Sequence, residues 1–149
     1  MLIREMRPDD CDALDALRAE PGLTIDPRVE LSGHLTRAWV ACDAPGGPLL
    51  GYALGWWVID ELELLAVGVL PEARRRGVGR RLLEHVLATT RASGGRRVLL
   101  EVARSNTAAR HLYERAGFAL LDVRRGYYGA TGDDALVMER LLEQQQTGD

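Results

Sequence analysis

The segment RRRGVG, residues 74–79, places three arginines before a glycine pair at the start of a helical pattern. From Val78 the apolar residues Leu82, Leu83, Val86 and Leu87 follow at offsets of four, five, eight and nine, which predicts a helix. Its first turn would present unpaired N–H groups and the positive end of the helix dipole, and glycines would let an anion approach. The segment thus favours a phosphate site, although a plain turn beside solvated arginines explains it about equally well.

Glu101 is the one carboxylate within an otherwise apolar predicted strand, RRVLLEVA. The side chains of Val98, Leu100 and Val102 alternate with it and form the opposite strand face. A glutamate there either reaches a cleft or is desolvated, and desolvation would make it a plausible general base. The alternative is an exposed Glu101 paired with a nearby arginine, which the strand pattern taken alone favours.

Two further polar residues have ordinary structural explanations. Asn106 stands directly before the helical segment TAARHLYERA and fits an N-cap. Tyr113 shares one side of that helix with Ala109 and Ala116, where most tyrosines are core aromatics. Taken separately, neither residue indicates a catalytic site.

Histidines and cysteines give no sign of a metal site. The three histidines form no triad or ligand pattern, and the two cysteines, Cys11 and Cys42, lack C-x-x-C spacing. We therefore predict no metal and no disulfide, with Cys11 in the core and Cys42 in a strand.

Composition is that of a globular protein. The chain has 149 residues, of which 46% are hydrophobic and 28% charged, and a net charge of −3 argues against nucleic-acid binding. No apolar leader or membrane span is evident, so we expect a cytoplasmic protein. We predict a single domain over residues 1–142, followed by a polar tail over residues 143–149.

The element order mixes strands and helices. Four helices are expected. The first follows the cap at Asp10 and extends through Leu17, and the second follows the cap at Asp26 and extends through Leu35. The third runs from Val78 to the glycines at 94–95, and the fourth from Asn106 through Ala116. The three consecutive strands after residue 37 should form an antiparallel meander. The seven expected strands are Leu2–Met6, Ala38–Cys42, Leu49–Val58, Glu61–Val69, Arg96–Ala103, Phe118–Arg125 and Ala135–Arg140.

Taken together, these motifs resemble one family. RRRGVG has the form R-x-x-G-x-G, and LEV, N-x-x-A and LYERAGF follow it, as in the GCN5-related N-acetyltransferases. The stretches ELELLAVGVLPEARRRGVGRRLL and RRGYY with DDALVMER are similar to the ribosomal-protein-alanine acetyltransferase subfamily, the RimI type. This resemblance implies a mixed α/β fold with a mostly antiparallel sheet of six to seven strands, splayed at the acetyl-CoA site and flanked by about four helices.

The resemblance also implies residue roles. Glu101 would be the general base and Tyr113 the general acid, Asn106 would reach the pantetheine arm, and Tyr127 and Tyr128 would shape the acceptor groove. Acetyl-CoA would be held by backbone groups of Val67, Gly68 and Val69 and by the segment of Arg74, Arg75, Arg76, Gly77, Val78, Gly79 and Arg80.

The implied activity is acetyl transfer to a primary amine, most readily the N-terminal α-amine of a ribosomal protein that begins with alanine. A small-molecule amine or lysine acetyltransferase is the alternative, and a non-catalytic coenzyme A sensor is a third. The partner would be a protein or peptide N-terminus, bound by a monomer or weak dimer. Either Trp56 or Trp57 could line the acceptor groove, but not both, because adjacent strand residues face opposite ways.

Overall fold

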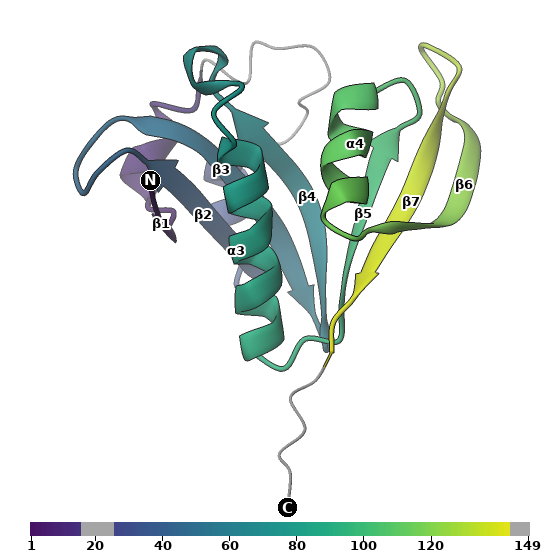
Figure 1. Cartoon of the computed structure of the whole chain (residues 1–149), viewed down its shortest axis with the longest axis horizontal. Coiled ribbons are helices and arrows are strands. Elements are labelled where there is room, and N and C mark those ends of the chain that lie inside the picture. Colours follow the sequence, from purple (N-terminus) through teal and green to yellow (C-terminus); the bar gives the residue numbers. More distant parts are fainter. Residues whose placement is uncertain (16–25, 144–149) are drawn as a thin grey trace, which may run out of the picture.

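The computed structural model describes residues 1–15 and 26–143, whose strands form one seven-stranded sheet in the order β1-β2-β3-β4-β5-β7-β6 (Figure 1). Every neighbouring pair is antiparallel except β4 and β5, which are parallel. The seven predicted strands and the meander β2-β3-β4 are therefore confirmed. The strands are β1 (Leu2–Glu5), β2 (Thr36–Cys42), β3 (Leu49–Val58), β4 (Glu61–Val69), β5 (Arg97–Ala103), β6 (Ala119–Tyr128) and β7 (Asp133–Leu141).

Helices are fewer than predicted. In the described ranges only α3 (Val78–Ala92) and α4 (Thr107–Arg115) exceed two turns, so the expectation of about four flanking helices is corrected. The expected helix after Asp10 begins as a 3-10 helix, η1 (Pro8–Cys11), and its continuation through Leu17 lies outside the described residues. The next, α2 (Pro27–Leu31), ends well before Leu35.

A glycine turn explains the early end of α2. The N–H of Gly33 donates to the carbonyl of Glu30 at 2.9 Å, which closes a turn directly after the helix. A second 3-10 helix, η2 (Pro71–Ala73), leads from β4 towards α3. No helix in the described part of the chain is long and apolar enough to cross a membrane.

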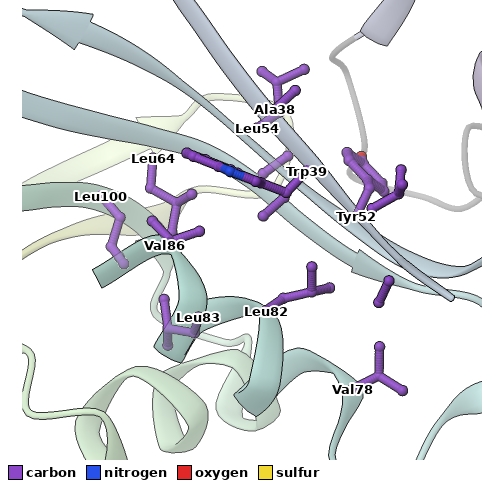
Figure 2. Close-up of a cluster of buried hydrophobic side chains, with 14 of the residues drawn as sticks. Ala38, Trp39, Tyr52, Leu54, Leu64, Val78, Leu82, Leu83, Val86 and Leu100 are labelled. Carbon is purple, nitrogen blue, oxygen red and sulfur yellow. The ribbon is translucent and has the colours of Figure 1, made fainter. Parts of the chain in front are cut away.

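Helix α3 packs its apolar stripe onto the sheet. Val78, Leu82, Leu83 and Val86 are all buried, and Figure 2 shows them directed towards the strand side chains of the core. Close approach depends on Gly51 of β3, where an added Cβ would lie 3.2 Å from Val78 Cγ1 and 2.5 Å from a backbone oxygen of β4. The predicted helical stripe is thus confirmed, and it anchors the arginine segment against β3 and β4.

The sheet opens between β4 and β5. The two strands pair only over Glu61–Leu64 and Arg97–Leu100 and then diverge, with α3 drawn over one arm and α4 over the other in Figure 1. The register of β4 against β3 shifts at Leu65, and such a bulge bends and twists a strand. The splay that the family resemblance implied is present, and the bulge lies where it begins.

Arg97 links the strands at the end of the sheet where β4 and β5 still pair. Its Nε lies 2.7 Å from Glu61 Oε1 on β4, and its Nη1 lies 2.8 Å from Glu139 Oε2 on β7. One guanidinium therefore joins three adjacent strands at the end where β4 and β5 still pair.

Candidate active site

Two cavities border β4 where it leaves β5. The first, of about 620 Å³, lies between the start of α3 and helix α4. It is lined by Arg74, Arg75, Arg80 and the helix-start glycines, and by Arg115 from α4. We call it the arginine cavity. Positive side chains from two helices thus surround the N-terminus of α3.

The backbone at the mouth of this cavity is shaped for an anion. Arg75 and Gly77 have φ values of 65° and 77°, which place both residues in the left-handed region, an uncommon and costly conformation for an arginine. Gly77 is the N-cap of α3, and the first turn of that helix contains no acidic residue. The start of α3 therefore combines free N–H groups, the positive end of the helix dipole and nearby arginines, and its first turn has no carboxylate. Such a site fits a phosphate group.

The predicted arginines divide into two groups. Arg74, Arg75 and Arg80 line the cavity, whereas Arg76 is directed to Asp43, with its Nη2 2.6 Å from the carboxylate. Arg80 Nε lies 3.0 Å from Glu84 Oε1. Both ion pairs are exposed and contribute little to folding, so the arginine charge there is largely available to a ligand.

The second cavity, of about 910 Å³, lies between the arms of the splay. We call it the acceptor cavity, after the acceptor groove that the family resemblance implies. Its walls come from β4, β5, the start of α4 and the hairpin that joins β6 to β7. Val67 lines this cavity and Val69 lines the arginine cavity, so Gly68 lies between the two. The predicted segment Val67, Gly68 and Val69 therefore runs from one cavity to the other.

Glu101 is both exposed to the acceptor cavity and paired with an arginine. Val98, Leu100 and Val102 are buried on the opposite face of β5, as the alternation predicts. Glu101 Oε1 lies 2.9 Å from Nη1 of Arg124 on β6. The predicted alternative, an exposed glutamate with an arginine partner, is thus confirmed, and the carboxylate still faces the cavity.

Tyr113 lies on α4 against the acceptor cavity and is only 8% exposed. Its ring packs against Phe118, with centroids 5.8 Å apart. Burial raises the pKa of the Tyr113 phenol to about 12. The hydroxyl therefore stays protonated near neutral pH, so that it can act as a proton donor and not as a base.

Tyr127 and Tyr128 lie at the end of β6, and both line the acceptor cavity. Their rings meet edge to face with centroids 5.3 Å apart, and the guanidinium of Arg124 lies 5.5 Å from the centre of the Tyr127 ring. Burial, and then the negative charge of Glu101, raise the pKa of Tyr128. The predicted groove tyrosines and Glu101 are thus brought to one cavity.

Asn106 has the predicted cap geometry. Its Oδ1 accepts a hydrogen bond from the N–H of Ala109 at 3.2 Å, and the residue also lines the acceptor cavity. Neither tryptophan lines that cavity in the described ranges: Trp56 Nε1 donates to Glu30 at 2.8 Å, and Trp57 borders a separate cavity beside β2.

Arg124, Ser105 and Asp133 belong to this site but escaped the sequence analysis. Ser105 and Asp133 line the acceptor cavity, and Arg124 holds Glu101. DDALVMER and RRGYY were noted as motifs, yet nothing in a single sequence pairs Asp133 with Ser105 across 28 residues. Only the strand order β5-β7-β6 brings them together.

The family is shown by comparison with known proteins. A family model described as the Acetyltransferase (GNAT) family matches residues 5–118. The chain therefore belongs to the GNAT acetyltransferase family, and membership implies acetyl-CoA as the co-substrate.

Similar proteins include N-terminal acetyltransferases. The [ribosomal protein bS18]-alanine N-acetyltransferase of Escherichia coli K12 is 39% identical over 94 residues, and the N-alpha-acetyltransferase RimI of Mycobacterium tuberculosis is 43% identical over 99 residues. These matches span 62% and 64% of this chain and 64% and 61% of the two relatives, less than two thirds of either. The crystal structure of the Escherichia coli ribosomal-protein-S18-alanine N-acetyltransferase superposes with a TM-score of 0.83 at 27% identity and covers 99% of this chain and 98% of that one.

Proposed function

We propose that this protein transfers the acetyl group of acetyl-CoA to the N-terminal α-amine of a protein. A ribosomal protein of the bS18 kind, with alanine first, is the leading candidate. The observation that carries the proposal is the placement of Glu101 and Tyr113 in one cavity, next to the β4 segment that leads to the arginine cavity. The name of the Escherichia coli relative supports the bS18 acceptor, and the name of the Mycobacterium tuberculosis relative supports an α-amine.

Acetyl-CoA would supply the activated acetyl group as a thioester. The diphosphate would be held at the start of α3 by backbone N–H groups and by Arg74, Arg75 and Arg80. The pantetheine arm would run along Val67, Gly68 and Val69, whose edge of β4 no longer pairs with β5. Asn106 borders the same passage from α4. No metal takes part in this proposal.

Glu101 and Tyr113 would divide the proton transfers. Glu101, directly or through a water, would take a proton from the acceptor amine, and the Tyr113 hydroxyl would donate one to the departing sulfur. A backbone N–H near Val69 would stabilise the developing oxyanion. An α-amine suits this site: with a pKa near 7.8, about a tenth is neutral at pH 7, against about 0.04% of a lysine side chain.

The test is intact-mass analysis of acetylation with acetyl-CoA and a panel of acceptors. The panel comprises peptides that begin with Ala, Ser or Met-Glu, a blocked peptide with an internal Lys, and spermidine. The sequence contains no lysine, so self-acetylation is confined to the protein's own N-terminus. Tyr113→Phe serves as the control for catalysis by contaminants.

We expect one acetyl group on the α-amine of the Ala peptide, well ahead of the other acceptors. Reaction of spermidine alone would transfer the assignment to small-molecule amines and overturn the protein substrate. Binding of coenzyme A without acetylation of any acceptor would favour the sensor hypothesis. A cytoplasmic location and a monomer or weak dimer stay predictions of the sequence, which fractionation and light scattering would test.

A further inference from the structure

The hairpin that carries Tyr127 and Tyr128 faces the turn between β5 and α4 across the acceptor cavity. Ser105 and Asn106 from the turn and both tyrosines from the hairpin line this cavity. Tyr128 pairs with Asp133 of β7, but the register of β6 against β7 shifts between Arg124 and Tyr128, so regular pairing is interrupted over residues 125–127. These residues, which include Tyr127, need a further contact to fix their position.

Two adjacent aspartates at the start of β7 supply that contact. Asp133 Oδ2 accepts hydrogen bonds from the hydroxyl of Ser105 at 2.5 Å and from its N–H at 3.3 Å. Asp134 Oδ2 accepts from Nε of Arg104 at 3.0 Å. Each aspartate thus binds the turn that ends in Asn106.

Asp134 also holds the irregular part of β6. Its Oδ1 accepts from the N–H of Gly126 at 2.9 Å, and Gly126 has a φ of 62°, which a residue with a side chain rarely adopts. Gly126 directly precedes the tyrosine pair. One carboxylate therefore joins the β5–α4 turn to the backbone that presents Tyr127 and Tyr128.

We propose that Asp133 and Asp134 are positioning residues, an aspartate clamp that holds Tyr127 and Tyr128 over the acceptor cavity and thereby sets the affinity for the acceptor. Neither aspartate lines the arginine cavity, so the clamp should act more on acceptor binding than on acetyl-CoA. The functional part of the inference rests on the proposed acetyltransferase activity. The structural part, a clamped hairpin, does not.

The hydrogen bonds also stabilise the ionised clamp. The pKa of Asp133 is lowered chiefly by the Ser105 hydroxyl, and the pKa of Asp134 is lowered chiefly by the Gly126 N–H and then by Arg104. Both carboxylates are therefore charged near neutral pH, despite their adjacency. Charged acceptors make stronger hydrogen bonds than neutral ones, which suits a clamp.

Steady-state kinetics with the Ala peptide test the functional part. Asp134→Ala should raise the peptide KM by about tenfold, with kcat and the acetyl-CoA KM within about twofold of the parent. Asp133→Asn, which keeps an oxygen acceptor for Ser105, should retain more peptide affinity than Asp133→Ala. Asp122→Ala is the matched control, because Asp122 is an exposed residue of β6 whose carboxylate accepts a hydrogen bond from the N–H of the adjacent Val123. An unchanged peptide KM, or equal changes in both KM values, would overturn the clamp's role in acceptor binding.

Hydrogen exchange tests the structural part without any acceptor. In Asp134→Ala, the amides of residues 125–132 should exchange about tenfold faster, while those of α3 stay as in the parent. Ser105→Ala, a milder change, gives the same test if Asp134→Ala folds poorly. Unchanged exchange in the hairpin would overturn the clamp itself. If the parent acetylates no peptide, the proposed function fails, and the exchange result alone decides whether the hairpin is clamped.

Discussion

The arginine cavity and the acceptor cavity lie along one strand, yet they are built in different ways. Half of the residues that line the arginine cavity come from a short continuous segment, residues 73–80, and α4 supplies the opposite wall. The acceptor cavity is assembled from β4, β5, α4 and the β6–β7 hairpin. The first therefore depends on local backbone conformation, and the second on strand order and on contacts between distant side chains.

This difference suits the two tasks. A diphosphate is the same in every acetyl-CoA, and backbone N–H groups at a helix start recognise it without help from variable side chains. An acceptor varies between enzymes, and a hairpin attached by a few hydrogen bonds can change its side chains without disturbing the core. Substitutions in the two cavities should therefore separate catalysis and acceptor binding from cofactor binding.

Tyr113→Phe should have the largest effect of these substitutions, on turnover and not on coenzyme A binding. Removal of the hydroxyl would leave the departing sulfur without the proposed proton donor, so we expect kcat to fall by about 10²–10⁴-fold. The dissociation constant of coenzyme A should change little, because Tyr113 does not line the arginine cavity. Rapid-quench kinetics measures kcat, and calorimetry measures the dissociation constant of coenzyme A. A loss of both kcat and coenzyme A affinity would show that the two cavities do not act separately.

Glu101→Gln should reduce activity by about 10²-fold near neutral pH. Part of the loss should be recovered as pH rises above about 8, because an α-amine then loses its proton to solvent and needs no base. A pH–rate profile of the variant against the parent measures this recovery. A pH-independent defect would indicate that Glu101 positions the hairpin through Arg124 and takes no proton.

Gly77→Glu should weaken coenzyme A binding by about 10–100-fold, because a carboxylate would enter the phosphate site and a side chain would be forced into the left-handed region. Gly94→Glu is the matched control: Gly94 also has a positive φ, with nothing within 4 Å of an added Cβ, but it lies beyond the opposite end of α3. Calorimetry should show near-parent affinity for this control. An equal loss of coenzyme A affinity in both variants would mean that the substitutions act by destabilising α3 and not at a phosphate site at its start.

The same contrast explains what the sequence could and could not predict. The helix start at Val78 and the cap at Asn106 follow from neighbouring residues, and both are confirmed. The ion pair of Glu101 with Arg124 and the hydrogen bond of Ser105 with Asp133 join residues that only the order β5-β7-β6 makes neighbours. The short α2 was mispredicted because the apolar spacing through Leu35 continues past Gly33, where the backbone turns.

The titration of Tyr113 gives the smallest effect and tests whether the buried Tyr113 hydroxyl is shielded from water. Burial raises the pKa of this phenol to about 12 from an ordinary value near 10. Its contribution to stability is therefore complete below about pH 10 and is lost as pH rises towards 12, by about 2–3 kcal/mol. Tyr52 has its pKa raised to about 12 by burial as well, so the parent alone cannot assign the signal.

The difference in ultraviolet phenolate absorbance between the parent and Tyr113→Phe isolates Tyr113. We expect that difference to appear near pH 12, with the catalytic rate of the parent insensitive to this group up to about pH 10. Ionisation near pH 10 would mean that water reaches the hydroxyl through the acceptor cavity. Tyr113 would then be a solvated phenol, and the proposed proton donation would lose the buried donor on which it depends.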